Sequence, residues 1–134
     1  MPNAFRFFLI CHGVESGPNI TNATLRGVVN SIVGLKHEAT PLLAVVGAVV
    51  APAMKGKPLD MMVWQLDKNG ERQRLPGYVG TPLILPDVLG AQVMPFHFAL
   101  PTPKSGVYGA DLFDRLGAFG ERETLLATFM FAVT

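Results

Sequence analysis

The stretch LDMMVWQLDKNGERQRLP, residues 59–76, decides the fold of this chain. It contains two strand-like segments around an Asp-Lys-Asn-Gly turn, and Asn-Gly between alternating residues is the strongest short-range signal for a β-hairpin. Met62, Trp64 and Leu66 recur at every second residue of the outgoing strand, so they share one face of it. We predict that this face is the core face, and that the chain is an antiparallel β protein.

The turn of this hairpin allows two registers. In a two-residue type I′ turn, Lys68 faces Glu71 across the hairpin. Asp67 then faces Arg72, so that both cross-strand pairs join opposite charges. A type I turn followed by a Gly bulge instead sets Asp67 against Glu71. We predict the type I′ turn, with the bulged turn as the alternative, and we expect the polar return strand 71–75 to lie near a sheet edge.

Composition bounds the class of protein. A chain of 134 residues predicts one domain, residues 1–134. Its single cysteine, Cys11, excludes an internal disulfide and fits a reducing compartment. The net charge of +1, with no basic block, predicts no nucleic-acid partner. Hydrophobic residues reach 49% and charged residues only 16%, so we expect an efficient core or an apolar surface covered by another subunit.

Two apolar stretches raise the question of a membrane. Residues 1–17 have one Arg and a short apolar run without a small-x-small cleavage site, so we interpret them as the first strand rather than a signal peptide. Residues 39–54 are uncharged, but as a helix they would span only about 24 Å of a hydrocarbon core of about 30 Å. The sequence therefore predicts no membrane association and a cytoplasmic protein.

The rest of the chain alternates strand-like segments with Gly- and Pro-containing turns. The pattern predicts about eight strands, drawn from residues 5–11, 20–35, 42–51, 59–66, 71–75, 79–85, 92–100, 107–113 and 125–133. Alternation assigns Met94, Phe96, Phe98 and Leu100 to one face of their strand, and Leu125, Ala127, Phe129, Phe131 and Val133 to one face of the last strand. We predict an all-β antiparallel β-sandwich, immunoglobulin-like or jelly-roll, with a closed barrel as the alternative.

Three strand predictions carry a particular feature. Residues 20–35 have helical spacing but many β-branched residues, so we predict one long or bent strand with a helix as the alternative. Gly47 marks a bulge or the close approach of another backbone. Pro82 interrupts residues 79–85 and indicates an edge strand.

The chain contains a strand ending in Asp-x-x-Gly, a Pro…Gly-x-Tyr strand and a terminal hairpin. The residues that carry these motifs are Asp67, Gly70, Pro101, Gly106 and Tyr108. In this order the features resemble a family of small bacterial β-sandwich proteins of unknown function. The resemblance covers residues 19–133 and departs from the family pattern over residues 113–124, where the loop is longer. It implies a fold and no transferable active site.

Histidine and cysteine offer weak candidates for chemistry. No two of His12, His37 and His97 stand at metal-ligand spacing. Cys11 and His12 are neighbours in a strand, so they point to opposite faces and do not pair as nucleophile and base. Cys11 shares a predicted face with Phe5, Phe7 and Leu9, which suggests a small buried hydrophobic residue. Ser16–Asn19 and Gly56-Lys57 lack the spacing of a phosphate-binding loop and are interpreted as turns.

The acidic and aromatic residues have a functional and a structural interpretation. Loop acids at one end of a sandwich can bind calcium, and the candidates are Asp60, Asp87, Asp111, Asp114, Glu121 and Glu123. The clustered calcium-loop pattern is missing, so we predict no metal. The aromatic set Trp64, Phe96, Phe98, Phe129 and Phe131 predicts a core, with an apolar ligand pocket as the alternative.

No constellation in the sequence indicates catalysis, so we assign no catalytic, cofactor-binding or metal-binding residue. We predict a non-enzymatic interaction or assembly module that forms a homo-oligomer, or binds a protein partner, through an apolar sheet surface. The alternative is a β-sandwich that binds a small apolar or carbohydrate ligand. An enzyme assembled from His37, His97 and Asp111 is the weakest hypothesis.

Overall fold

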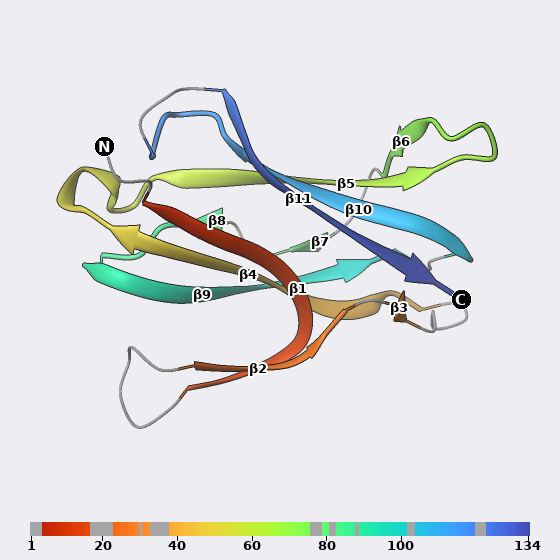
Figure 1. Ribbon diagram of the computed structural model, residues 1–134, viewed down its shortest axis with the longest axis horizontal. Helices are drawn as coiled ribbons and strands as arrows, with labels where there is room; N and C mark the ends of the chain where they lie inside the picture. The colour runs from red at the N-terminus through yellow and green to blue at the C-terminus, as the bar shows by residue number, and fades with distance from the viewer. Residues whose placement is uncertain are drawn as a thin grey trace.

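Two packed β-sheets make up the computed structural model, which describes residues 4–16, 23–29, 31–32, 38–75, 79–80, 83–87, 89–101, 104–119 and 123–134 (Figure 1). Within these ranges the chain forms eleven strands and one short 3-10 helix. The prediction of an all-β sandwich is confirmed. The described strands outnumber the eight expected because four of them are only two or three residues long.

Each sheet has a core of three long strands. Sheet A has the order β2 (Ala23–Val28), β1 (Phe5–Ser16), β4 (Thr40–Val50), β9 (Gly90–Leu100) and β7 (Val79–Gly80). Sheet B has the order β3 (Ser31–Ile32), β11 (Thr124–Val133), β10 (Gly106–Asp114), β5 (Pro58–Leu66) and β6 (Arg72–Arg74), with β8 (Leu83–Ile84) beside β5. The strands pair antiparallel except for β3 with β11. The 3-10 helix, Pro52–Met54, connects β4 of sheet A to β5 of sheet B.

The main core lies between the sheets and is built from alternate residues of the long strands. Sheet A contributes Phe8, Ile10, Leu42, Ala44, Val46, Ala48, Val50, Met94, Phe96, Phe98 and Leu100. Sheet B contributes Leu59, Met61, Val63, Tyr108, Ala110, Leu112, Phe131 and Val133. The predicted core face of β9 is therefore confirmed. Each large apolar side chain contributes about 1.5–3 kcal/mol when it is fully buried.

Strand β1 bends along its length and takes part in two layers. Its first half pairs with β4, whereas its second half pairs with β2. In Figure 1 the second half turns back beneath β4 and β9. We call this hairpin, formed by residues 11–16 and 23–28, the β1–β2 arm. The strand continues to Ser16, beyond the predicted end at Cys11.

The β1–β2 arm covers the outer face of sheet A. Val14 and Leu25 of the arm pack against a second apolar cluster formed by Cys11, Leu43 and Val45. These three side chains are buried although they face away from the main core. Strand β4 is thus buried on both faces, which explains its uninterrupted apolar sequence and confirms the prediction of a buried strand.

Strand β1 also contains a bulge near its start. The β1–β4 register shifts between Phe5 and Phe7, which makes Arg6 an extra residue. Phe7 lies opposite Gly47, and its ring is so close that a Cβ at Gly47 would overlap with it. The close approach at Gly47 is therefore made by a ring rather than by a backbone. The bulge also separates Phe5, which packs against the main core, from Phe7, so the prediction that they share a face is wrong.

The hairpin between β5 and β6 has the bulged register. The N–H of Asp67 donates to the carbonyl of Glu71 over 2.9 Å, and Gly70 has a φ of 76°. The prediction of a type I′ turn is wrong, and the alternative holds. The reason is the Asp67 carboxylate, because its Oδ1 accepts the N–H groups of Asn69 and Glu71 at 2.8 and 2.9 Å. Gln73 donates to Oδ2 over 3.0 Å. These bonds, with that from Glu71 first, lower the pKa of Asp67.

Strand β5 turns the opposite face to the core from the one predicted. Leu59, Met61 and Val63 point into the main core. Trp64 is also buried, but on the outer face of sheet B. Both faces of this strand are apolar, so its own sequence does not distinguish them. The polar edge predicted for the return strand is confirmed, because β6 is exposed and ends sheet B.

Two predicted strands are divided between the sheets. Residues 20–35 contain β2 of sheet A and β3 of sheet B, so the prediction of one continuous strand is wrong, although the described residues are extended as predicted. Gly27, with a φ of 59°, lies just before β2 ends. Residues 79–85 likewise contain β7, which ends sheet A, and β8. Pro82 lies outside the described residues.

The Gly-x-Tyr segment forms the start of β10. The Tyr108 hydroxyl donates to the carbonyl of Lys104 and accepts its N–H, each over 2.9 Å. The ring of Tyr108 stacks on Phe131, with centroids 5.9 Å apart. Burial raises the pKa of the Tyr108 hydroxyl. The hydroxyl thus closes the turn before β10, which resembles the tyrosine corner of immunoglobulin-like sandwiches.

Candidate functional site on the outer face of sheet B

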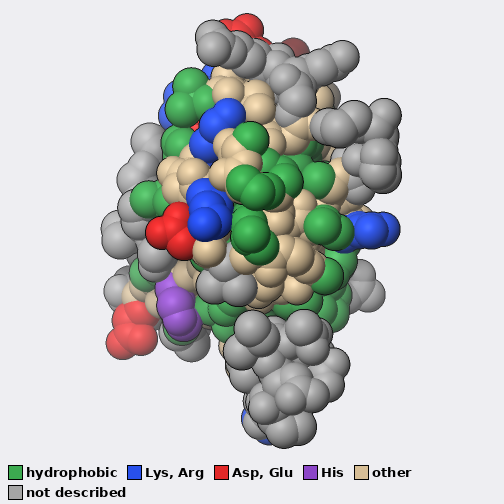
Figure 2. Space-filling model, turned by 90° about the vertical axis from the view of Figure 1, so that its left-hand side faces the viewer, with side chains coloured by type: hydrophobic (Ala, Val, Ile, Leu, Met, Phe, Trp, Pro, Cys, Tyr) green, Lys and Arg blue, Asp and Glu red, His purple; other side chains and the backbone are tan. Residues whose placement is uncertain are grey.

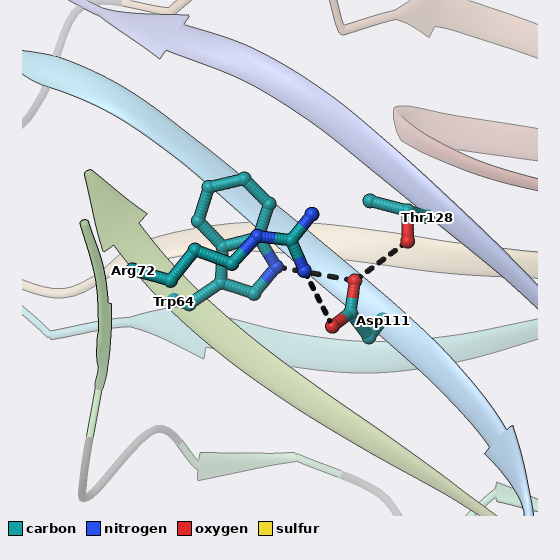
Figure 3. Close-up of polar contacts among 4 residues, drawn as sticks. All are labelled: Trp64, Arg72, Asp111 and Thr128. Carbon is teal, nitrogen blue, oxygen red and sulfur yellow. Dashed lines mark hydrogen bonds and ion pairs between the residues drawn. The ribbon is translucent and has the colours of Figure 1, made fainter. Parts of the chain in front are cut away.

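Four side chains form a polar cluster on the outer face of sheet B (Figure 3). Asp111 Oδ1 accepts the indole Nε1–H of Trp64 over 3.2 Å and the hydroxyl of Thr128 over 2.7 Å. Asp111 Oδ2 accepts Nη1–H of Arg72 over 3.2 Å, and this contact is also an ion pair. The guanidinium carbon of Arg72 lies 4.3 Å from the centroid of the Trp64 ring. We call these four residues the Asp111 cluster.

The pairing of three strands brings the Asp111 cluster together. Trp64 of β5 lies opposite Gly109 of β10, and a Cβ at Gly109 would overlap with the indole. The ring therefore lies flat across β10 and reaches Asp111, two residues further along. Thr128 of β11 lies directly opposite Asp111. Arg72 extends over the indole from the edge strand β6, as Figure 3 shows.

The Asp111 cluster holds the positively charged guanidinium of Arg72 in a fixed position. The carboxylate is nearly buried and receives three donors, and hydrogen bonds to a charged group contribute about 1.5–3 kcal/mol each. The Arg72 side chain remains about half exposed, and only one of its N–H groups is bound within the cluster. The indole and the carboxylate together hold the guanidinium in place. The remaining guanidinium N–H groups can donate to an approaching molecule.

Apolar side chains surround this cluster on the two strands that follow β5 in the sheet. Val107 of β10 is 38% exposed, and Leu125 and Met130 of β11 are 49% and 51% exposed. They share the outer face because Met130 lies opposite Gly109 and Leu125 lies opposite Phe113. We call Val107, Leu125 and Met130 the β10–β11 face. The prediction that Leu125 shares a face with Phe129 is wrong, because the ladder shifts between Leu112 and Phe113.

Other exposed apolar side chains lie apart from this face. Leu89 precedes β9, Ile84 lies in β8, and Val28 ends β2. Figure 2 shows the end of the sandwich where β4 ends and β9 begins, and there hydrophobic side chains gather in the centre with Lys and Arg beside them. The β10–β11 face differs because three large apolar side chains come from two adjacent long strands.

The candidate calcium ligands are separated by the fold. Asp111 points outward, whereas Asp114 is fully buried and accepts the N–H groups of Ala118 and Phe119 at 2.7 and 2.8 Å. Asp60 pairs with Arg115 over 2.6 Å. Glu121 lies outside the described residues. Asp87 and Glu123 are exposed. Across the described ranges, no group of three His, Cys, Asp or Glu side chains could hold a metal ion.

The structure also separates the histidine candidates. His97 lies on the outer face of sheet A and Asp111 on that of sheet B, so both sheets lie between them. His37 is outside the described residues. His12 is exposed, whereas Cys11 beside it is buried, as predicted. Burial raises the pKa of the Cys11 thiol, which keeps it in its unreactive form.

Of the two glycine-containing segments, only Gly56-Lys57 lies wholly within the described residues, and it forms a turn. Gly56 has a φ of 70° and lies in the turn before β5. Ser16 ends β1, and residues 17–22 lie outside the described ranges.

Sequence reasoning assigned Trp64 to the core and weighed Asp111 as a calcium ligand and as part of an enzyme site with two histidines. It missed Arg72, Thr128 and Gly109 as parts of this cluster. Asp111 carries a signal that could have been used, since an acid in the middle of an apolar strand requires polar partners. The partners themselves depend on the strand order β11-β10-β5-β6, which the sequence does not specify.

Comparison of the chain with family models, curated proteins and solved structures found no match. Among the described residues, no helix is long and apolar enough to cross a membrane. Function is therefore argued below from the geometry of this chain.

Proposed function

We propose that this protein is a non-enzymatic assembly module that associates with a second copy of itself through the β10–β11 face. The supporting observation is the exposure of Val107, Leu125 and Met130, at 38%, 49% and 51%, on adjacent strands. Clustered apolar side chains in contact with water are typical of interaction sites. A symmetric contact would remove these side chains from water in both copies at once.

Charge favours a second copy as the partner. The only charged side chain that points outward from β10 between Val107 and Phe113 is Asp111, and Arg72 neutralises it. Strand β11 has no charged residue. A two-fold contact brings a surface against its own copy, so an unneutralised charge there would meet a like charge. This face avoids that repulsion, and it lacks the net charge that would select an oppositely charged partner.

The residues beside the face also suit an interface. Methionine and arginine are enriched in protein interfaces, and this surface presents Met130 and the half-exposed Arg72, which lies over the buried Trp64. Trp64 and Arg72 are already held by Asp111. They therefore lose little conformational freedom when a partner binds, which reduces the entropic penalty of association.

The direct test is the oligomeric state in solution. Size-exclusion chromatography with light scattering should give a mass that is a multiple of 14.4 kDa and falls on dilution. The variant Met130→Lys places a charge at the centre of the contact, so we expect it to be a monomer with unchanged circular dichroism. A native protein that stays monomeric at every concentration would overturn the proposal.

The matched control is Leu89→Lys. Leu89 is 49% exposed, close to the value for Met130, but it precedes β9 and lies outside the β10–β11 face. We expect this variant to associate like the native protein. If Leu89→Lys dissociates the assembly and Met130→Lys does not, the contact lies elsewhere on the molecule.

We also propose a family relation and a cellular compartment for this protein. A relation to small bacterial β-sandwich proteins is supported by the sandwich and by the hydroxyl contact of Tyr108. A reducing compartment such as the cytoplasm is supported by Cys11, which is a free and buried thiol.

A further inference from the structure

Strand β11 has an open edge. One side of it pairs with β10 along the full ladder from Gly106 to Asp114. On the other side, among the described strands, only β3 pairs with it, and only at Ala132 and Val133. Over residues 125–131, no described strand forms a ladder with β11 on the side away from β10. Unpaired main-chain groups of an edge strand are a template for a strand from another molecule.

The other described edges are short or carry a charge or a proline: the side of β9 that β7 leaves free contains Pro95, and the half of β1 that β2 leaves free contains Arg6. Strand β6 is three residues long and includes Arg72 and Arg74. Strand β2 includes Arg26 and contains Gly27 at positive φ. Strands β3, β7 and β8 have two residues each. In contrast, β11 has ten residues, TLLATFMFAV, without charge or proline. Natural proteins use charges, prolines and short strands to prevent edge pairing, and the open edge of β11 uses none of these.

The direction of the free main-chain groups follows from the contact with β3. The N–H of Thr134 donates to the carbonyl of Ile32 over 2.9 Å, so the main-chain groups of Thr134 point away from β10. Main-chain direction alternates along a strand. The N–H and C=O groups of Met130 and Thr128 therefore point to the same open side, whereas those of Phe129 point toward β10.

We propose that β11 pairs antiparallel with β11 of a second copy, so that sheet B continues across the two-fold axis of a dimer. This inference rests on the proposed self-association and specifies its geometry. An uncharged strand paired with itself brings no like charges together. The same pairing sets Leu125 and Met130 of both copies side by side, which joins the two β10–β11 faces into one continuous surface.

Amide hydrogen exchange of the native protein tests this geometry without a variant. The amides of Thr128 and Met130 should exchange fast in dilute solution and slow down roughly tenfold or more when most chains are associated. The amide of Phe129, between them, should be protected at both concentrations because it faces β10. If the chain associates while Thr128 and Met130 remain unprotected, edge pairing is overturned and the proposed function stands. If the chain never associates, both proposals fail.

A pair of variants at one position separates the main chain from the side chain. Thr128→Pro removes the outward N–H and the hydroxyl, whereas Thr128→Val removes only the hydroxyl that bonds Asp111. Edge pairing predicts that Thr128→Pro is monomeric and that Thr128→Val associates like the native protein. Equal association of the two folded variants would contradict the proposal. Should the proline variant not fold, the exchange measurement decides.

Discussion

The outer faces of the two sheets each hold an aromatic ring across a glycine, but they hold it in different ways. On sheet A, Phe7 lies over Gly47 within an uncharged cluster that the β1–β2 arm covers. On sheet B, Trp64 lies over Gly109 and is bound to Asp111, with Arg72 above it. One ring belongs to a second apolar layer, and the other is fixed by polar bonds.

The difference shows two ways in which the outer face of a sheet can be stabilised. A covering layer buries the face but requires additional chain, which here is the second half of β1 together with β2. Polar bonds fix a ring locally and leave the neighbouring side chains in water. Sheet B therefore keeps the exposed β10–β11 face, whereas Leu43 and Val45 of sheet A are no longer accessible.

The largest loss of stability is expected when the apolar cluster on the outer face of sheet A is disrupted. Leu43→Ala removes a buried side chain under the β1–β2 arm and should lower the free energy of unfolding by about 3 kcal/mol. Denaturant unfolding measures this change. Leu89→Ala, at a position that is 49% exposed and outside the β10–β11 face, serves as the control, with an expected change of less than about 0.5 kcal/mol. A similar small loss for both would mean that the arm does not seal the cluster.

A Gly→Ala substitution beneath the ring of Phe7 or of Trp64 compares the two ring–glycine contacts directly. Gly109→Ala should lower the free energy of unfolding by about 2 kcal/mol, because Trp64 is held by Asp111 and cannot move aside. Gly47→Ala should have a smaller effect, because Phe7 is only partly buried and can turn toward solvent. The emission of Trp64, the only tryptophan, should change in the first variant alone. Equal losses would show that the polar bonds add no restraint.

Removal of the Asp111 carboxylate tests how far its hydrogen bonds hold Trp64 in place on sheet B. Asp111→Ala leaves the buried indole N–H without its acceptor and should lower the free energy of unfolding by about 1.5 kcal/mol. It should also increase the quenching of Trp64 fluorescence by acrylamide, because Arg72 is no longer held above the ring. Asp87→Ala, which removes an exposed acid, should leave both measurements unchanged. Unaltered quenching in Asp111→Ala would show that the indole is held by packing alone.

The smallest effect concerns the hairpin tip, and it depends on pH. The N–H of Glu71 and two further donors lower the pKa of Asp67 below its usual value. A carboxyl with a lowered pKa stabilises the folded state above its unfolded pKa, and this stabilisation is lost as the pH falls through the folded value. Asp67→Ala should thus be less stable than the native protein at pH 7, and the difference should diminish in acid. A difference that persists below the folded pKa would contradict this origin.

The sequence predicted the parts of the fold that depend on alternation and turn chemistry. The strand around Phe96 has one clearly apolar face, so its position and its core side followed from its residues. Both faces of β5 are apolar, because Met61 and Val63 alternate with Met62 and Trp64. The core side of such a strand is set by its neighbours, since Gly109 makes room for the indole only on the outer face.

The Asp111 cluster is made of residues that lie far apart in the sequence. Asp111 bonds Trp64, 47 residues away, and Arg72, 39 residues away. Those contacts depend on the order of strands in sheet B. The hairpin register was missed for a local reason, because Asp67 accepts two N–H groups of the turn and thereby selects the bulge. The Asn-Gly signal identified the turn but not its type.

The reactivity of Cys11 can report how often the β1–β2 arm opens. Cys11 carries the only thiol in the sequence, and it lies at the base of the β1–β2 arm, in the apolar cluster that the arm covers, with its Sγ 3.4 Å from the carbonyl oxygen of Gly13. A thiol-specific reagent has a single target, which is shielded while the arm is closed. The labelling rate of the native protein therefore measures how often the arm lifts from β4, separately from global unfolding.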